Sequence, residues 1–229
     1  MSLLSICRNA TDEVGLRRPI VVIGGTDATS IRCLRYAARV GRELVKMNID
    51  HLIKEYTFNT TASEDTYTLP ADFDHFVPFT HWNRTESRRM YPIQAEEWQG
   101  FKSGLATVSL NDRFRIRGID RDFLIEPVPT SVETIAFEYV SKNYCKSSGG
   151  VGKAAWSSDT DNSVCDEDIF EMGVIWRLLN RMGQPYAEEK AEYQRALNTM
   201  IAQINPQKVS LNGNLPASSN LPDANFPSS

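Results

Sequence analysis

The chain has 229 residues, with 25 basic and 29 acidic side chains and a formal net charge of -4. A hydrophobic content of 41% is that of an ordinary globular protein, which excludes a wholly disordered chain, a coiled-coil rod and a collagen-like repeat. The small acidic excess also argues against a strongly basic nucleic-acid-binding protein, because a duplex partner usually requires clustered positive charge.

Targeting signals and cysteine usage indicate synthesis in a cytoplasm. No stretch reaches the roughly 18 consecutive apolar residues that a membrane span needs, and the N-terminus lacks the basic region of a secretory signal. The four cysteines have no Cys-x-x-Cys spacing and are predicted to be reduced, mostly buried thiols: Cys7, Cys33, Cys145 and Cys165.

The first 48 residues predict two helices. A short amphipathic helix spans residues 3–15 and ends at Gly15. After the connection RRPIVVIGG, Thr26 or Asp27 is expected to cap a longer helix that runs to about Asn48.

The longer helix carries a basic stripe on one face. Five basic side chains fall within about 80° of the helical wheel: Arg32, Arg35, Arg39, Arg42 and Lys46. The stripe is expected to meet solvent or an acidic protein surface, such as the acid-rich C-terminal hairpin of the same chain or a neighbour. Nucleic-acid phosphate is the alternative.

Residues 53–144 change to the two-residue period of β-strands. Strands are predicted at EYTFNT, DTYTLP, FRIRGI, FLIEPV and TIAFEYVSK, joined as an antiparallel meander, with one helix at 95–104. Residues 145–162 are small, polar and Gly-rich, so they predict a loop.

The next segment predicts a pair of antiparallel helices. Ser163 is expected to cap the first helix, which Gly183 ends, and Pro185 to open the second, which runs to about Gln203. The last 26 residues are rich in turn residues and carry only two charges, Lys208 and Asp223. They predict either plain disorder or an extended arm that docks on a partner through Leu211, Leu215, Leu221 and Phe226.

Together these elements predict an α+β fold. Residues 1–52 and 163–203 are expected to form a helical bundle that includes the C-terminal αα-hairpin. Residues 53–144 form an inserted antiparallel β-rich region, residues 145–162 a loop, and residues 204–229 an extended docking arm.

The candidate catalytic motifs in the sequence each lack required residues. SGGVGKA at 148–154 lacks the first glycine and the Mg²⁺-binding hydroxyl of a phosphate loop, and VVIGG lacks the dinucleotide-binding pattern. His75 and His81 have no zinc-like spacing, and paired acids such as Glu96 and Glu97 are typical of solvated helix starts. The sequence therefore predicts no catalytic residue, metal or cofactor, and a protein that is not an enzyme.

Three segments in order resemble the head-to-tail adaptor, or tail tubular A-like, family of tailed double-stranded DNA phages. They are LPADF followed by Trp-Asn-Arg within 66–84, FEYVSKN within 114–144, and a helix that begins Asp-Glu-Asp and contains a Trp-Arg pair within 159–197. The resemblance covers much of residues 3–205.

The resemblance implies a structural virion protein at the head–tail junction. It implies a ring, typically a dodecamer, that joins the portal protein to a tail nozzle or tail tube protein and continues the DNA channel. Helices would build the ring, the β-rich region would face the next tail component, and Leu211, Leu215, Leu221 and Phe226 would sit in portal clefts. DNA would pass without sequence-specific binding, and no membrane is involved. A nucleic-acid-binding module that uses the basic stripe, and a virion-carried cell-wall hydrolase, are the alternatives.

Overall fold

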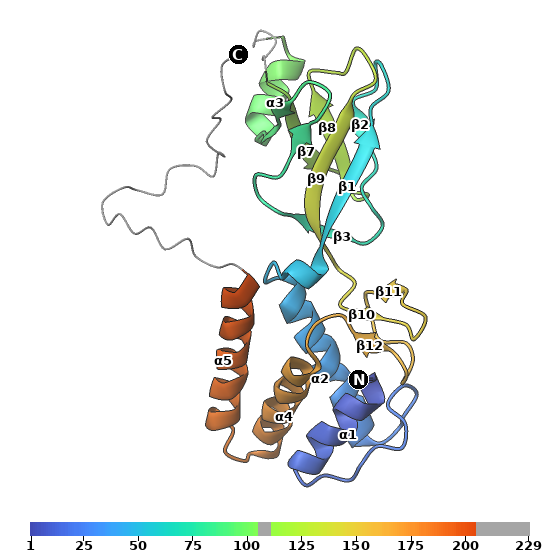
Figure 1. Ribbon diagram of the computed structural model, residues 1–229, viewed down its shortest axis with the longest axis vertical. Helices are drawn as coiled ribbons and strands as arrows, with labels where there is room; N and C mark the ends of the chain where they lie inside the picture. Colours follow the sequence, from blue (N-terminus) through green and yellow to red (C-terminus); the bar gives the residue numbers. More distant parts are fainter. Residues whose placement is uncertain (105–110, 205–229) are drawn as a thin grey trace, which may run out of the picture.

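The computed structural model describes residues 1–104 and 111–204, which form a helical part and a β-rich part that lie end to end (Figure 1). The helices are α1 (Leu3–Glu13), α2 (Ala28–Val45), the 3₁₀ helix η1 (Asp50–Leu52), α3 (Ala95–Lys102), α4 (Glu167–Met182) and α5 (Ala187–Ile204). The mixture of these helices with mainly antiparallel sheets confirms the predicted α+β fold. Within the described ranges no helix combines the length and apolar character that crossing a bilayer requires.

Helix boundaries follow local chemistry that the sequence makes visible. Asp27 accepts a hydrogen bond from the Ser30 amide at 2.9 Å and caps α2, as predicted. Gly183 ends α4 in the left-handed conformation at φ 72°, which glycine adopts without steric cost. The predicted Ser163 cap is wrong: Asp166 accepts from the Asp168 amide, while the Ser163 hydroxyl donates to the buried Cys165 carbonyl.

Helix α4 lies at the centre of the helical part and packs against α1, α2 and α5. The shared core is aliphatic and aromatic, and its fully buried members include Leu3, Ile6, Leu44, Ile49, Leu52, Tyr144 and Phe170. Two glycines let backbones approach closely. A Cβ on Gly41 would lie 2.2 Å from the Tyr144 ring, and one on Gly173 would lie 2.5 Å from Val40.

The β-rich part contains two sheets that enclose an aromatic core. The strands are β1 (Ile53–Asn59), β2 (Thr66–Tyr67), β3 (Phe73–Phe76), β4 (Trp82–Asn83), β5 (Arg88–Arg89), β6 (Tyr91–Pro92), β7 (Arg113–Arg117), β8 (Asp122–Glu126) and β9 (Thr134–Ser141). One sheet has the order β1-β9-β4-β5 with β3 also paired to β9, and the other has the order β2-β8-β7-β6. The rings between them include Phe73, Phe76, Phe114, Phe123 and Phe137. Trp98 of α3 is buried with Ile93 and Leu124 in a separate small cluster.

The predicted meander is wrong. Strand β9 pairs with β1 from Ile53↔Val140 to Asn59↔Thr134, across more than 70 residues of chain, and also with β3 and β4. The order follows from burial, because β9 is buried at six of its eight positions and therefore occupies the centre of its sheet. Strand β6 is parallel to β7, which a meander does not allow.

The segment predicted as a loop contains a small sheet instead. Strands β10 (Cys145–Lys146), β11 (Gly152–Lys153) and β12 (Asn162–Ser163) pair in the order β11-β10-β12. The buried Asp161 carboxylate holds the turn together by accepting from the amides of Ser157 and Ser158 and from Lys153. Trp156 anchors the segment by packing between Tyr144 and Phe170.

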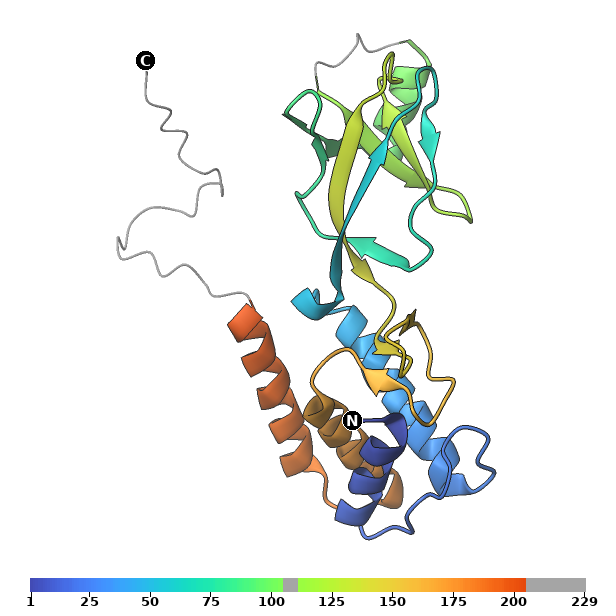
Figure 2. The ribbon, with the colours of Figure 1, turned by 45° about the vertical axis from the view of Figure 1, so that its right-hand side comes forward.

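Two short passages of chain connect the parts. The first runs from α2 through η1 into β1, and the second leaves β9 and reaches Tyr144, whose ring packs over Gly41 of α2. Figures 1 and 2 both show η1 and the β1–β9 pair at this junction. The position of the helical part relative to the β-rich part therefore depends on a few buried contacts around Tyr144.

We expect Gly41→Ala to lower the free energy of unfolding by about 1–3 kcal/mol, because the added methyl group would overlap the Tyr144 ring, which is 1% exposed. Urea denaturation followed by circular dichroism measures the change. The matched control is Gly100→Ala in α3, where a Cβ meets no atom within 4 Å. That substitution is expected to stabilise the chain by about 0.5–1 kcal/mol through helix propensity. Equal effects at both sites would contradict close packing at Gly41.

Candidate interaction site

The basic stripe lies on the outer face of α2, opposite the face that packs in the core. Arg35, Arg39, Arg42 and Lys46 are exposed and Arg32 is half-buried. Among the described residues only Arg39 of these five has an ion-pair partner, Glu43 on its own helix, at 3.4 Å. The other four cations remain available to a partner.

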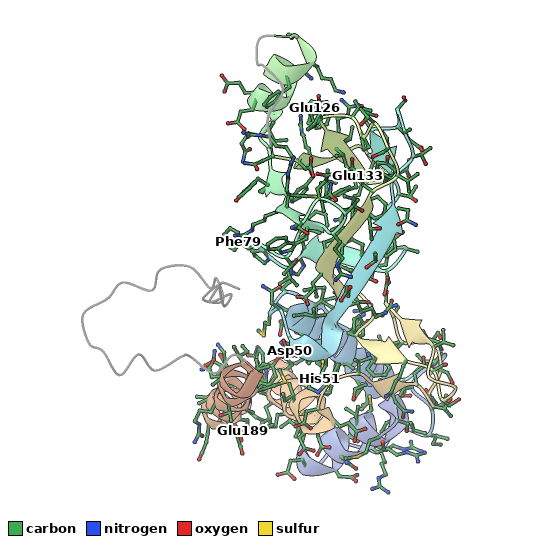
Figure 3. The ribbon with its side chains drawn as sticks, turned by 45° about the horizontal axis from the view of Figure 1, so that its top comes forward. Asp50, His51, Phe79, Glu126, Glu133 and Glu189 are labelled. Atoms are coloured by element: carbon green, nitrogen blue, oxygen red, sulfur yellow. The ribbon has the colours of Figure 1, made fainter. Side chains whose placement is uncertain are left out.

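Among the described residues, no cation of the stripe pairs with an acid of the hairpin. The ion pair that joins α2 to the hairpin has the acid on α2 and the cation on the hairpin. Glu43 on α2 accepts from the guanidinium of Arg177 on α4 and, at 3.3 Å, from the Tyr193 hydroxyl on α5. Four acids of the hairpin are exposed, namely Asp166, Asp168, Glu188 and Glu192, whereas Glu167 and Glu171 contact Met1 and Asn9. Figure 3 shows Glu189 on the outer side of the hairpin.

A groove opens between α2, α4 and α5, which we call the helical groove. It has a volume of about 510 Å³, and its lining includes Glu43, Met47, Trp176, Arg177, Lys190, Tyr193, Leu197 and Ile201. Arg177 is 4% exposed, and its guanidinium lies 4.2 Å from the Trp176 ring centre and 5.5 Å from that of Tyr193. Burial, followed by the negative charge of Glu43, raises the pKa of Tyr193 to about 12, so this hydroxyl stays protonated and can donate.

A second surface lies on the β-rich part and is rich in exposed rings. Phe79, Trp82 and Tyr91, which we call the aromatic surface, are 74%, 41% and 44% exposed. The Arg89 guanidinium lies 4.9 Å from the Phe79 ring centre and 5.8 Å from that of Tyr91, and it donates to the Phe79 carbonyl at 3.2 Å. A shallow pocket of about 290 Å³ adjoins Phe79 and Trp82. Figure 3 shows Phe79 at the edge of the β-rich part.

Phe79 also has an unusual backbone. Its φ of 67° lies in the left-handed region, which bulky side chains rarely adopt. Backbone strain of this kind persists where surrounding contacts fix it and often accompanies binding sites. The turn at Phe79 therefore holds a large apolar ring in solvent beside Trp82 and Tyr91, and aromatic residues are enriched at protein interfaces.

The residues with possible catalytic chemistry lie apart or are buried. His81 stacks on Phe114 with ring centres 4.0 Å apart, and His75 lies between Asp74 and Asn48. Burial raises the pKa of the Cys145 and Cys165 thiols to about 12, which suppresses thiolate formation. Within residues 1–104 and 111–204, no group of three His, Cys, Asp or Glu side chains is arranged to hold a metal ion.

The two loops that resemble phosphate-binding motifs are closed by acidic side chains. Lys153 of SGGVGKA bonds to Asp161 at 2.6 Å and to Ser157 at 2.8 Å. In VVIGG, the Asp159 carboxylate accepts from the amides of Val22 and Ile23. A carboxylate therefore occupies the lysine of the first motif and the amides of the second, which are the groups that a phosphate would need.

Sequence reasoning located the basic stripe but missed both the helical groove and the aromatic surface. The groove depends on Glu43 and Arg177, which are 134 residues apart, and no local pattern links them. The aromatic surface had a partial signal in the ring-rich stretch from Phe76 to Trp82, but a sequence does not show which rings are exposed. The four predicted arm residues, Leu211, Leu215, Leu221 and Phe226, lie outside the described residues.

Comparison with known proteins supports a structural role. A family model described as SU10 adaptor protein matches residues 1–218. This match confirms the resemblance to phage head–tail adaptors. A search of curated proteins found no match.

The buried His81 predicts a specific pH dependence. Burial, and secondarily the positive charge of Arg89, lowers the pKa of His81 from 6.5 to about 4. Between pH 4 and pH 6.5, His81 therefore binds a proton in the unfolded chain but not in the folded chain. The free energy of unfolding is therefore expected to fall as pH is lowered from 6.5 to 4, by at most about 3 kcal/mol, and this contribution is fully present above pH 6.5.

Urea denaturation at several pH values between 7 and 4 measures this decrease. His81→Phe retains a ring for stacking on Phe114 and is expected to flatten the pH dependence within that window. His51→Gln, which changes an exposed histidine, is the matched control and should leave the decrease intact. An unchanged slope in His81→Phe would show that other groups cause the pH dependence.

Proposed function

Because the chain belongs to the SU10 adaptor protein family, a family of phage structural adaptors, we propose that it forms a ring between the portal and the tail of a virion. The family match over residues 1–218 carries this proposal. The ring would contain twelve copies and continue the DNA channel at the head–tail junction. The protein would act as a structural part and not as an enzyme.

The proposed ring body is the helical part, residues 1–52 with 163–203. The basic stripe on α2 and the exposed acids of the α4–α5 hairpin lie on different surfaces and do not pair within the described chain. Opposite charges on two different surfaces favour a head-to-tail contact between neighbouring copies, and such contacts close into rings when the rotation fits.

The proposed contact with a tail nozzle or tail tube protein is the β-rich region, residues 53–144. The aromatic surface supports this assignment, because exposed Phe, Trp and Tyr side chains with a neighbouring arginine are the residue types enriched at protein interfaces. Arg89 holds two of the rings in place, so less side-chain freedom is lost when a partner covers them.

The proposed contact with the portal is the arm of residues 204–229. Leu211, Leu215, Leu221 and Phe226 would each contribute about 1.5–3 kcal/mol when fully covered, and ordering the arm would offset much of this gain. One arm would therefore bind modestly. A ring presents many arms at once, and the resulting high effective concentration makes joint attachment tight.

The proposed passage of DNA agrees with the charge of the chain. Each copy has a formal net charge of -4, which a ring multiplies. If acidic side chains face the channel, they repel DNA phosphates and keep the genome from adhering to the wall.

A nucleic-acid-binding module remains a second candidate function, because Arg35, Arg42 and Lys46 are exposed cations on one helix face without ion-pair partners in the described chain. Phosphate contacts from this face would give DNA affinity with a steep dependence on salt.

We expect the full-length chain to co-sediment with portal rings of its phage at a fixed ratio, and a chain that ends at Gln203 to lose this binding by more than 10-fold. Analytical sedimentation of the mixtures measures both. Replacing Leu211 and Leu215 with serine in the full-length chain tests whether apolar side chains carry the contact. If the truncated chain binds equally well, the arm is not the portal anchor, and if neither chain binds, portal attachment itself is refuted.

Charge reversal separates the two roles of the basic stripe. We expect Arg35→Glu combined with Arg42→Glu to weaken self-association on the portal by at least 10-fold at low salt, as measured by sedimentation. Adding Glu188→Lys and Glu192→Lys to this variant is expected to restore part of the self-association, because the two surfaces again carry opposite charges. The matched control is Arg117→Glu with Lys146→Glu, which changes the net charge equally at exposed sites elsewhere. Filter binding to DNA across a salt series is the second measurement. A reduction of the salt slope by about 2 in the stripe variant, with intact self-association, would favour nucleic-acid binding.

A further inference from the structure

The helical groove is a site that neither the ring contact nor the tail contact uses. Helices α2 and α5 both pack against α4, and the groove is the space left between them. Its aliphatic lining comes from Met47, Leu197 and Ile201, of which Met47 and Ile201 are half-buried. These side chains can still cover apolar groups of an occupant.

The groove wall also contains polar atoms without partners. The indole N–H of Trp176 and the Nε–H of Arg177 are both buried, and neither has a hydrogen-bond acceptor. A buried donor without an acceptor is unfavourable, and native proteins usually satisfy such groups. Trp176 is half-buried and lines the groove, so a peptide carbonyl bound there is a candidate acceptor for its N–H.

The charges of the groove are largely matched among themselves. Glu43 pairs with Arg177, and the Lys190 ammonium lies 5.7 Å from the centre of the Trp176 ring. A strongly charged occupant would therefore gain little. The lining favours an uncharged extended segment that offers backbone carbonyls and a few aliphatic or aromatic side chains.

We propose that, in the free chain, the helical groove binds this chain's own residues 205–229. This segment follows directly on α5, whose Tyr193, Leu197 and Ile201 form one wall. It contains Leu211, Leu215, Leu221 and Phe226 and only two charged side chains. Its composition therefore matches the lining.

The segment is also long enough to reach every part of the groove. Its 25 residues span up to about 80 Å when extended, whereas α5 rises only about 17 Å between Lys190 and Ile201. Pro206 is the second residue after α5 in the sequence, and proline lacks the backbone N–H that would continue a helix. Attachment to the same chain gives an effective concentration near the millimolar range, which favours the chain's own segment over that of another copy.

The inference deepens the proposed function, because it assigns the arm a binding place before it meets the portal. A segment held in the groove keeps its apolar side chains from association with other free copies. The portal then competes with the groove for the same residues, so the arm becomes available only where a portal provides better contacts.

A synthetic peptide of residues 205–229, titrated into a chain that ends at Ile204, tests the groove without any portal present. The apolar cores described above lie within residues 1–204, and thermal denaturation confirms that the shortened chain is folded. We expect one-to-one binding by calorimetry. We also expect a downfield shift of the Trp176 indole proton in NMR spectra, which Trp176→Phe identifies by its absence.

Two variants locate the binding. Ile201→Asp, on the groove wall, is expected to weaken peptide binding at least 10-fold, and Phe79→Asp, an equal change on the aromatic surface, is expected to leave it unaltered. A peptide with Leu211→Ser and Leu215→Ser should bind at least 10-fold more weakly. Absence of binding, or equal binding to Ile201→Asp, would overturn the inference while leaving the portal experiment untouched.

The full-length chain tests whether the groove is occupied by its own segment. Added peptide is expected to bind the full-length chain about 10- to 100-fold more weakly than the shortened one, because the tethered segment competes at high effective concentration. Equal affinity for both chains would overturn occupation in the free chain. A dimer of the full-length chain that the shortened chain does not form would assign the segment to a neighbouring copy and would also overturn the proposal.

Discussion

The close approach of α2 to α4 is the constraint on which the helical part depends. Gly173 leaves no room for a side chain beside Val40, and its position also brings the Tyr193 ring of α5 within reach. One turn further along each helix, Glu43 and Arg177 meet as a pair that Tyr193 joins. A buried ion pair adds little net stability, but removal of one partner leaves an uncompensated charge, so the pair fixes how the three helices are aligned. The helical groove is a direct result of that alignment.

The junction between the two parts is defined by a single aromatic residue and its surroundings. Tyr144 follows β9 by three residues, yet its ring lies in the helical core against Gly41 and near Trp156. The long pairing of β9 with β1 continues directly into η1 and α2, so both passages are anchored in the same core. Partners bound at the aromatic surface and at the basic stripe would therefore be held in a fixed relation by one chain.

Local chemistry made the helices predictable, whereas long-range pairing made the sheets difficult to predict. Asp27 and Gly183 marked helix ends correctly because capping depends on neighbouring residues alone. Strands β3 to β6 and β10 to β12 are two to four residues long, too short for a period to show, and β3 and β4 pair with β9, more than 50 residues away. The candidate sites differ in the same way. The basic stripe lies on one helix, so its spacing was visible in the sequence. The helical groove is formed by three helices, and the aromatic surface is defined by which rings are exposed, and neither property is visible in a local pattern.

The presence of two separate apolar cores has a consequence for how this chain can evolve. The aromatic core of the β-rich part and the helical core are separate clusters that adjoin at β9, where Tyr139 belongs to the first and Val140 to the second. Substitutions far from this strand are expected to have effects on stability that add. Val77, two residues before Phe79, packs against the helical core, so changes of the loop at Phe79 that suit a different neighbour have to keep that contact. If the β-rich part contacts the tail as proposed, a virus lineage that exchanged its tail parts and kept its capsid would show divergence concentrated in that part of this molecule.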